Sequence, residues 1–165
     1  MFENLSIRAG KKALEIIRDE GFKPSRVRVV AGASGAAKFL VLTGIDRVFL
    51  TMVKDRKQPL YLVGTSIGAF RMAAYCQKDP AKAIDTLERD YIAQHYGAKV
   101  TSEDISLQSR RILDSYIADE DVDDILAHPF MRLSFLANKC KGLLRSENKL
   151  LQAGGLSFAN RSRLS

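Results

Sequence analysis

The sequence predicts an α/β fold in which helices flank a parallel sheet. Two short apolar segments have the composition of strands, a turn of small residues follows each, and an amphipathic segment follows each turn. This order favours parallel strands, because a right-handed crossover through a helix places the next strand alongside in the same direction. The 165 residues, 46% of them apolar and 27% charged, fit one globular domain.

The first elements follow from periodicity and turn residues. Residues 6–20 show the spacing of an amphipathic helix, which can end at Gly21 because glycine adopts left-handed conformations without strain. Residues 26–31 are rich in β-branched side chains, which favours a strand. After a turn of small residues, positions 38–54 again have apolar side chains at helical spacing.

The central segment repeats this order. Residues 60–63 form the second predicted strand. Both strands are apolar over most of their length, as expected when a strand is buried on both faces. A glycine turn follows over residues 64–68, and a helix is predicted from Ile67 to about Gln77.

The part after residue 78 is predicted to be mainly helical. Asp79 and Pro80 are a favourable N-cap and first helical residue for a helix that reaches Tyr96. Further helical patterns cover residues 106–117, 121–127 and 130–151. No third strand is predicted. We therefore expect one domain over residues 1–165, with a core at 26–78 and a helix-rich part at 79–165.

Composition and charge limit the class of protein. No apolar run has the roughly 18 residues of a membrane helix, and charges interrupt the N-terminus where a secretory signal would be continuous. Cys76 and Cys140 lack metal or redox spacing, which favours free thiols in a reducing cytoplasm. The acidic run at residues 119–124 lacks the central glycine of a calcium loop. No metal or other cofactor is predicted.

The net charge of +7 is divided into blocks along the chain. Residues 1–57 carry +6, residues 58–127 carry −5, and residues 128–165 carry +6. Basic ends around an acidic middle do not form one basic patch, so nucleic acid is disfavoured as a partner. The basic segment after residue 128 has apolar residues between its charges. It fits either contact with an anionic membrane or a helix packed on a sheet, and we favour the second.

A G-x-S-x-G sequence, Gly64-Thr65-Ser66-Ile67-Gly68, marks the candidate site. It follows a strand and opens a helix, as a nucleophile elbow does. The turn is so tight that side chains two residues before and after the serine would collide, which explains both glycines. The structural alternative is a plain strand-to-helix turn with a capping serine. We favour Ser66 as a nucleophile at the positive end of a helix.

A second small-residue turn, Gly32-Ala33-Ser34-Gly35, lies at the same carboxyl edge of the predicted sheet. Backbone N–H groups of such a loop can stabilise the oxyanion of an acyl transfer. The alternative is phosphate binding through Gly32 to Lys38. This segment lacks the third glycine of a dinucleotide fingerprint and the flanking residues of a P-loop lysine, so nucleotide binding is less favoured.

Residues 27–75, with both turns, resemble the patatin-like phospholipase family. The resemblance implies a three-layer α/β/α fold, Ser66 as the acyl-accepting nucleophile, and Gly32 and Gly35 in an oxyanion hole. The family's glycine run is interrupted here by Ala33 and Ser34, and Lys38 stands near the place of the family's arginine.

The resemblance also implies a Ser–Asp dyad whose aspartate stands in a downstream Asp-Gly pair. This sequence has no Asp-Gly pair, and its histidines, His95 and His128, lie in segments that favour helix rather than after a late strand. We therefore expect the N-terminal part of such an enzyme, with low activity by itself.

The sequence thus favours a cytoplasmic serine hydrolase of lipid or other ester substrates, and it leaves peripheral contact with anionic membranes open. The alternative is a non-catalytic basic module that binds anionic lipid or nucleic acid. A third, weaker alternative is an α/β nucleotide-binding protein.

Overall fold

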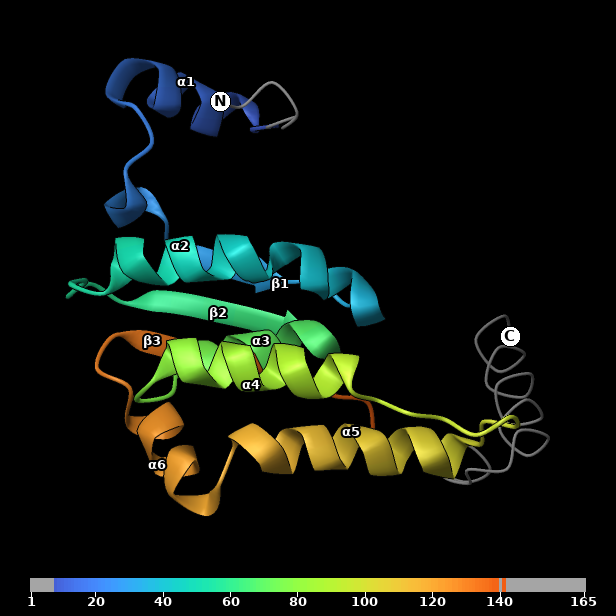
Figure 1. Cartoon of the computed structure of the whole chain (residues 1–165). Helices are drawn as coiled ribbons and strands as arrows, with labels where there is room; N and C mark the ends of the chain where they lie inside the picture. The colour runs from blue at the N-terminus through green and yellow to red at the C-terminus, as the bar shows by residue number, and fades with distance from the viewer. Residues whose placement is uncertain (1–7, 140, 142–165) are drawn as a thin grey trace.

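The computed structural model describes residues 8–139 and 141, and it is an α/β fold with a parallel sheet (Figure 1). Its elements in chain order are α1 (Lys11–Glu20), the 3₁₀ helix η1 (Pro24–Arg26), β1 (Val29–Gly32), the 3₁₀ helix η2 (Ala36–Leu42), α2 (Thr43–Val53), β2 (Leu60–Thr65), α3 (Ile67–Tyr75), α4 (Pro80–Ile92), α5 (Ser102–Tyr116), α6 (Asp119–Ala127) and β3 (Met131–Leu136). The predicted fold class is confirmed.

The sheet has the order β1-β2-β3, and both pairs of neighbouring strands are parallel. Both crossovers move the chain in the same direction across the sheet, so right-handed connections place α2 and α3 on the same face. There α4 packs against both helices, and α5 packs on α4. Buried side chains of β2, α3 and α4, among them Leu62, Met72 and Leu87, form the core between these layers.

Strand β3 corrects the prediction that residues 130–151 are helical and that no third strand exists. Residues 131–136 pair with the whole of β2, from Leu60–Met131 to Thr65–Leu136. Met131 and Leu133 point to the helical side of the sheet, and Arg132 and Ser134 alternate with them. This alternation has the period of a strand, and pairing with β2 outweighs the weak helical pattern. Residues 140 and 142–151 lie outside the described residues.

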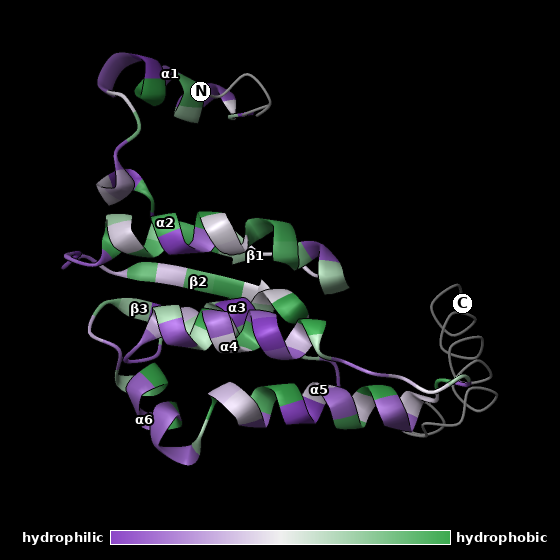
Figure 2. Ribbon diagram, viewed as in Figure 1, coloured by the Kyte–Doolittle hydropathy of each residue, from purple (hydrophilic) through white to green (hydrophobic). Residues whose placement is uncertain are grey.

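The two faces of the sheet differ, which corrects the prediction that β1 and β2 are buried on both. Along β2, Leu60 and Leu62 are fully buried, whereas Tyr61 is 51% and Val63 37% exposed. Within residues 8–139, helices cover one face only, so the described residues do not form the third layer that the family resemblance implies. The strands are coloured largely as hydrophobic, while α4, α5 and α6 carry long hydrophilic stretches (Figure 2).

The helices differ from the prediction mainly at their ends. The segment predicted as one helix over residues 38–54 is divided into η2 and α2. Helix α4 ends at Ile92 rather than Tyr96. Helix α5 begins at Ser102, because Thr101 and Asp104 form a capping box. None of the described helices is both long and apolar enough to cross a membrane.

Candidate active site

The Ser66 turn joins β2 to α3 directly. Ser66 has φ 51° and ψ −131°, and it shares a positive φ with only one other non-glycine residue of the described part, Ala36. A side chain in this conformation costs about 1–3 kcal/mol, and such strain clusters at functional sites. Ser66 is exposed, whereas Ile67 beside it is buried in the core. The turn thus leaves Ser66 open to solvent and buries the following residue, Ile67, in the core.

The glycines on either side of Ser66 are required by backbone contacts. A Cβ at Gly64 would lie 2.6 Å from the amide nitrogen of Ala69, on the first turn of α3. A Cβ at Gly68 would overlap the carbonyl oxygen of Gly32 and lie 2.8 Å from that of Ala33. Real Cβ atoms essentially never approach backbone so closely, so the turn can close only with glycine at both positions.

The same contacts bring the two predicted turns together. Gly32 pairs with Gly64 in the sheet register, and a Cβ at Gly32 would lie 2.7 Å from the Gly68 carbonyl oxygen. The loop after β1 therefore packs against the first turn of α3, backbone to backbone. Of the other residues predicted here, Ala33 and Ser34 are exposed and Gly35 and Thr65 are half-buried.

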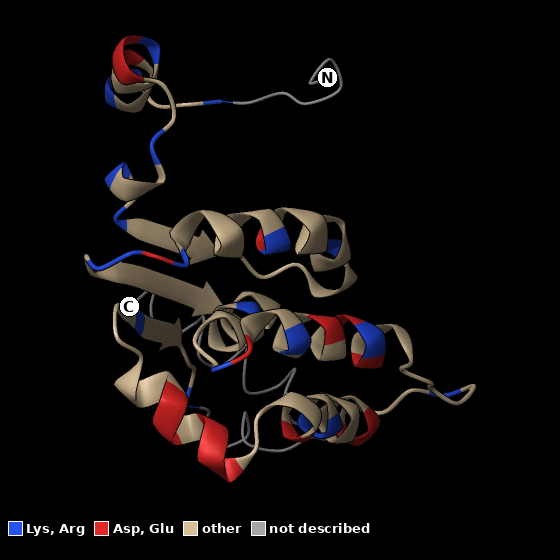
Figure 3. Cartoon of the chain, turned by 60° about the vertical axis from the view of Figure 1, so that its left-hand side comes forward, with Lys and Arg blue, Asp and Glu red and all other residues tan. Residues whose placement is uncertain are grey.

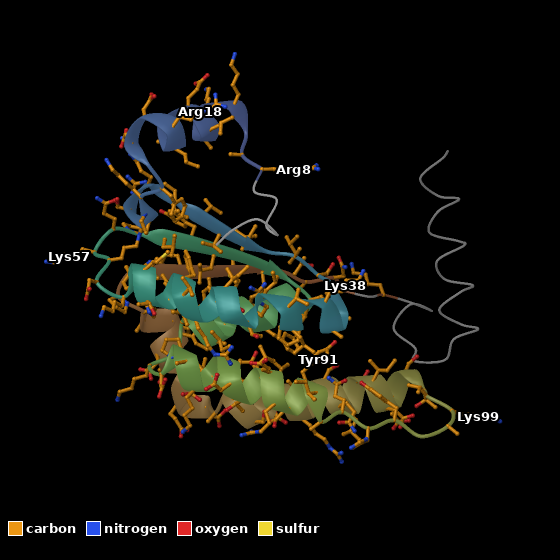
Figure 4. All side chains as sticks on the ribbon, turned by 45° about the horizontal axis from the view of Figure 1, so that its top comes forward. Arg8, Arg18, Lys38, Lys57, Tyr91 and Lys99 are labelled. Carbon is orange, nitrogen blue, oxygen red and sulfur yellow. The ribbon has the colours of Figure 1, made fainter. Side chains whose placement is uncertain are left out.

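Helix η2 continues from this loop and is anchored by an aromatic contact. Phe39 is buried, and its ring meets that of Tyr91 on α4 edge-on, with centroids 4.9 Å apart. Lys38 lies on η2 at the end of the sheet where β1 and β2 end, and Tyr91 lies between the helical layers (Figure 4). Lys38 is exposed. The site edge therefore carries a cation near the loop.

Among the described residues, no side chain accepts a hydrogen bond from the Ser66 hydroxyl, so none is in place as its general base. His128 lies at the opposite end of the sheet, where β3 begins, and its Nδ1 accepts hydrogen bonds from the amides of Phe130 (3.3 Å) and Met131 (2.9 Å). Burial, with a smaller contribution from Arg132, lowers the pKa of His128. His95 lies in the segment after α4. His128 is therefore not placed to activate Ser66, and no described hydrogen bond joins His95 to Ser66.

The other predicted chemistry is not assembled by the described residues. They contain no cluster of three or more His, Cys, Asp or Glu side chains suited to a metal ion. Cys76 is fully buried, and burial raises the pKa of its thiol to about 12, so it is not a nucleophile at neutral pH. Cys140 lies outside the described residues.

A buried charged cluster was missed by the sequence reasoning. Asp46 of α2 is 1% exposed and bonded to Arg71 and Tyr75 of α3. Burial, followed by the Asp46 charge, raises the pKa of Tyr75, so its hydroxyl stays a donor. The sequence shows only that Asp46 shares a helix face with Thr43 and Val53, because the partners that allow its burial come from another helix.

Comparison of the chain with protein-family models, curated proteins and solved structures found no significant match. The class of site is therefore argued from geometry: a strained serine between a parallel strand and a helix, beside a small-residue loop.

Proposed function

We propose that this protein is a serine acyl hydrolase of the patatin-like type, acting on lipid or other ester substrates. The observation that carries the proposal is the backbone contact between Gly32 and Gly68, which sets the loop beside the strained Ser66. A strained serine at a strand-to-helix turn is the arrangement of a nucleophile elbow. The plain capping alternative is less favoured, because the Ser66 side chain makes no capping bond to α3.

In the proposed reaction, the Ser66 oxygen attacks the ester carbonyl carbon and its proton passes to a base. The carbonyl oxygen gains the negative charge. Backbone N–H groups of the Gly32–Gly35 loop and the positive end of α3 would stabilise that charge. The base returns its proton to the leaving oxygen as the ester C–O bond breaks and the alcohol departs. Water then hydrolyses the acyl–serine bond, which releases the acid and restores the Ser66 hydroxyl.

The base is the part of the proposed site that residues 8–139 do not supply. The family resemblance requires an aspartate in an Asp-Gly pair, and this sequence contains none. Loss of a triad or dyad member typically lowers kcat by about four orders of magnitude or more, with a residual rate from the oxyanion hole. We therefore expect slow hydrolysis that depends on Ser66.

A short-chain nitrophenyl ester assay of wild type against Ser66→Ala tests the proposal. Slow turnover that disappears in Ser66→Ala supports it, as does slow attachment of a fluorophosphonate probe to Ser66. Hydrolysis that survives the substitution would rule out Ser66 as the nucleophile. Fast hydrolysis abolished by the substitution would instead reveal a base that we have not identified.

A second candidate, a basic module that binds anionic lipid, is favoured by one observation. Lys and Arg gather on η1 and the loop before β2, whereas α1 carries both charges and α6, beside β3, is mostly acidic (Figure 3). Helix α1 has no buried residue, and Leu14, Ile16 and Ile17 are each more than a third exposed. Contact with anionic membranes would then use this N-terminal region.

Vesicle co-sedimentation over a series of salt concentrations tests this second candidate. Binding to anionic vesicles that weakens with salt, without fluorophosphonate labelling, would favour the binding module over the hydrolase. Absence of binding at low salt would exclude it.

A further inference from the structure

A buried ionic cluster lies between the helices that follow the two parts of the candidate site, the Gly32–Gly35 loop and the Ser66 turn. Asp46 on α2 accepts hydrogen bonds from Arg71 Nε at 3.0 Å, from a second nitrogen of the same guanidinium, and from the Tyr75 hydroxyl at 2.7 Å. Asp46 is 1% and Arg71 7% exposed. Three donors satisfy this carboxylate, and a charge buried without its partner would be strongly destabilising.

The position of this cluster in the chain relates it to the site. Helix α2 is reached from Gly35 through η2, and α3 begins immediately after Ser66. Arg71 and Tyr75 lie five and nine residues after Ser66, on the middle and last turns of α3. The cluster therefore joins the helix that carries the serine to the helix that follows the loop.

Besides its apolar packing on β2 and α4, helix α3 has two specific attachments along its length. At its first turn, the Gly68 backbone contacts Gly32. Further along, Arg71 and Tyr75 are bonded to Asp46, and the Tyr75 ring stacks on Phe49 of α2 at 5.7 Å. Apolar packing is not directional, whereas the bonds from Arg71 and Tyr75 to Asp46 are, so these bonds fix the rotation of α3 about its axis.

Other contacts hold α2 without involving α3. Thr43, which is 5% exposed, donates to Glu88 of α4 at 3.1 Å. Arg47 bonds Asp85 and Glu88 of the same helix. Loss of Thr43 should therefore weaken the packing of α2 on α4 but leave the attachment of α3 intact.

We infer that Asp46 is a positioning residue, which sets the Ser66 turn relative to the Gly32–Gly35 loop. The inference rests on the proposed function, because the position of the Ser66 turn relative to the loop matters for acyl transfer. A displacement of about 1 Å between reacting groups can lower a rate about a hundredfold. Removal of the Asp46 charge leaves Arg71 buried without its partner, so α3 must move to hydrate the guanidinium.

The test compares Asp46→Asn with the matched control Thr43→Val, both on α2 and both losing a buried hydrogen-bonding group. The rate constant and the affinity for fluorophosphonate labelling of Ser66 are measured separately, at a temperature where both variants are folded. Asp46→Asn should lower the rate constant about tenfold or more with unchanged affinity, and Thr43→Val should stay within about twofold. Equal rate constants in wild type and Asp46→Asn would overturn the inference.

Hydrogen exchange provides a readout that does not depend on catalysis. Amides of residues 32–38 and 64–70 should exchange about tenfold faster in Asp46→Asn, whereas Thr43→Val should accelerate exchange only in α2 and α4. If wild type shows no labelling, the proposed function fails, and exchange alone decides the role of Asp46. Unchanged exchange in both segments would then disprove it.

A milder variant covers the case in which Asp46→Asn does not fold. Tyr75→Phe removes one of the three donors and leaves the ion pair with Arg71 intact. It should lower the rate constant of Ser66 labelling and accelerate amide exchange, each by a smaller factor than Asp46→Asn. If Tyr75→Phe changes neither, the cluster does not position the turn.

Discussion

The turns at the ends of β1 and β2 and the region of α6 and β3 are built in different ways. At Gly32, Gly64 and Gly68, backbone packs directly on backbone, and there is no space for a side chain. Strand β3 pairs with β2 through its backbone, but its contacts with the helices are made by side chains. Met131 is buried, but Phe135 is 62% and Leu136 73% exposed. Backbone contacts cannot be relieved by a change of rotamer, so almost any substitution in the first region should be strongly destabilising. In the second region, the loss of stability should depend on how deeply the substituted side chain is buried.

Gly68→Ala should have the largest effect. The added methyl group would overlap the Gly32 carbonyl oxygen, and neither backbone segment can move without breaking the sheet or α3. We expect a loss of about 4 kcal/mol or more, enough to unfold many domains. Urea denaturation followed by circular dichroism measures it.

Gly44→Ala is the control for this substitution, because a Cβ at Gly44 would meet no atom within 4 Å. Within α2, alanine should be neutral or stabilise the helix by up to about 1 kcal/mol. Equal losses in Gly44→Ala and Gly68→Ala would contradict the claim that the backbone contact at Gly68 excludes a side chain.

Met131→Ala should be the costliest change in β3, since its side chain is 3% exposed. Removing a buried methionine side chain costs about 2–5 kcal/mol, depending on how far the cavity collapses. Phe135→Ala on the same strand should change the free energy of unfolding by only about 0.5 kcal/mol, because that ring is mostly in solvent. A larger loss for Phe135→Ala would mean that the exposed ring is covered by something else.

Ser66→Gly should stabilise the protein. Glycine adopts a positive φ without the penalty that serine incurs there, so the expected gain is about 1 kcal/mol. Thermal unfolding measures the gain, and Ser66→Ala should show none, because alanine keeps the Cβ. A loss of stability in Ser66→Gly would argue that the hydroxyl has a structural role.

Acid should weaken the start of β3 slightly. The pKa of His128 is lowered by burial in the fold, so the unfolded chain binds more protons below about pH 6.5 and stability falls as pH decreases. Protonation of Nδ1 also removes the acceptor for the Phe130 and Met131 amides. These amides should exchange faster at pH 5 than expected from intrinsic rates.

In His128→Asn, whose side-chain oxygen can accept without titrating, the extra acceleration should disappear. Persistence of the acceleration in His128→Asn would assign it to another group.

The sequence was sufficient for much of the candidate site because its signals are local. Gly64, whose Cβ would meet Gly68 and Ala69 of the same turn, is interpretable from the sterics of a tight turn alone. The helix start at Pro80 with its Asp79 cap was also predictable, and the structure shows the Asp79 side chain bonded to the amide of Lys82. Such signals need no knowledge of distant segments.

Tertiary contacts decided the features that the sequence reasoning missed. Residues 131–136 become a strand because β2 offers a partner, and Asp46 is buried because Arg71 and Tyr75 come from another helix to meet it. The exposed face of the sheet depends on where α2 and α3 lie. The sequence by itself determined local features such as Gly64 and the Asp79 cap, whose contacts involve neighbouring residues. Gly68, by contrast, is required by Gly32 and Ala33 at the end of another strand. Strand pairing, burial of charge and coverage of the sheet required residues far apart in the chain, so only the tertiary structure decided them.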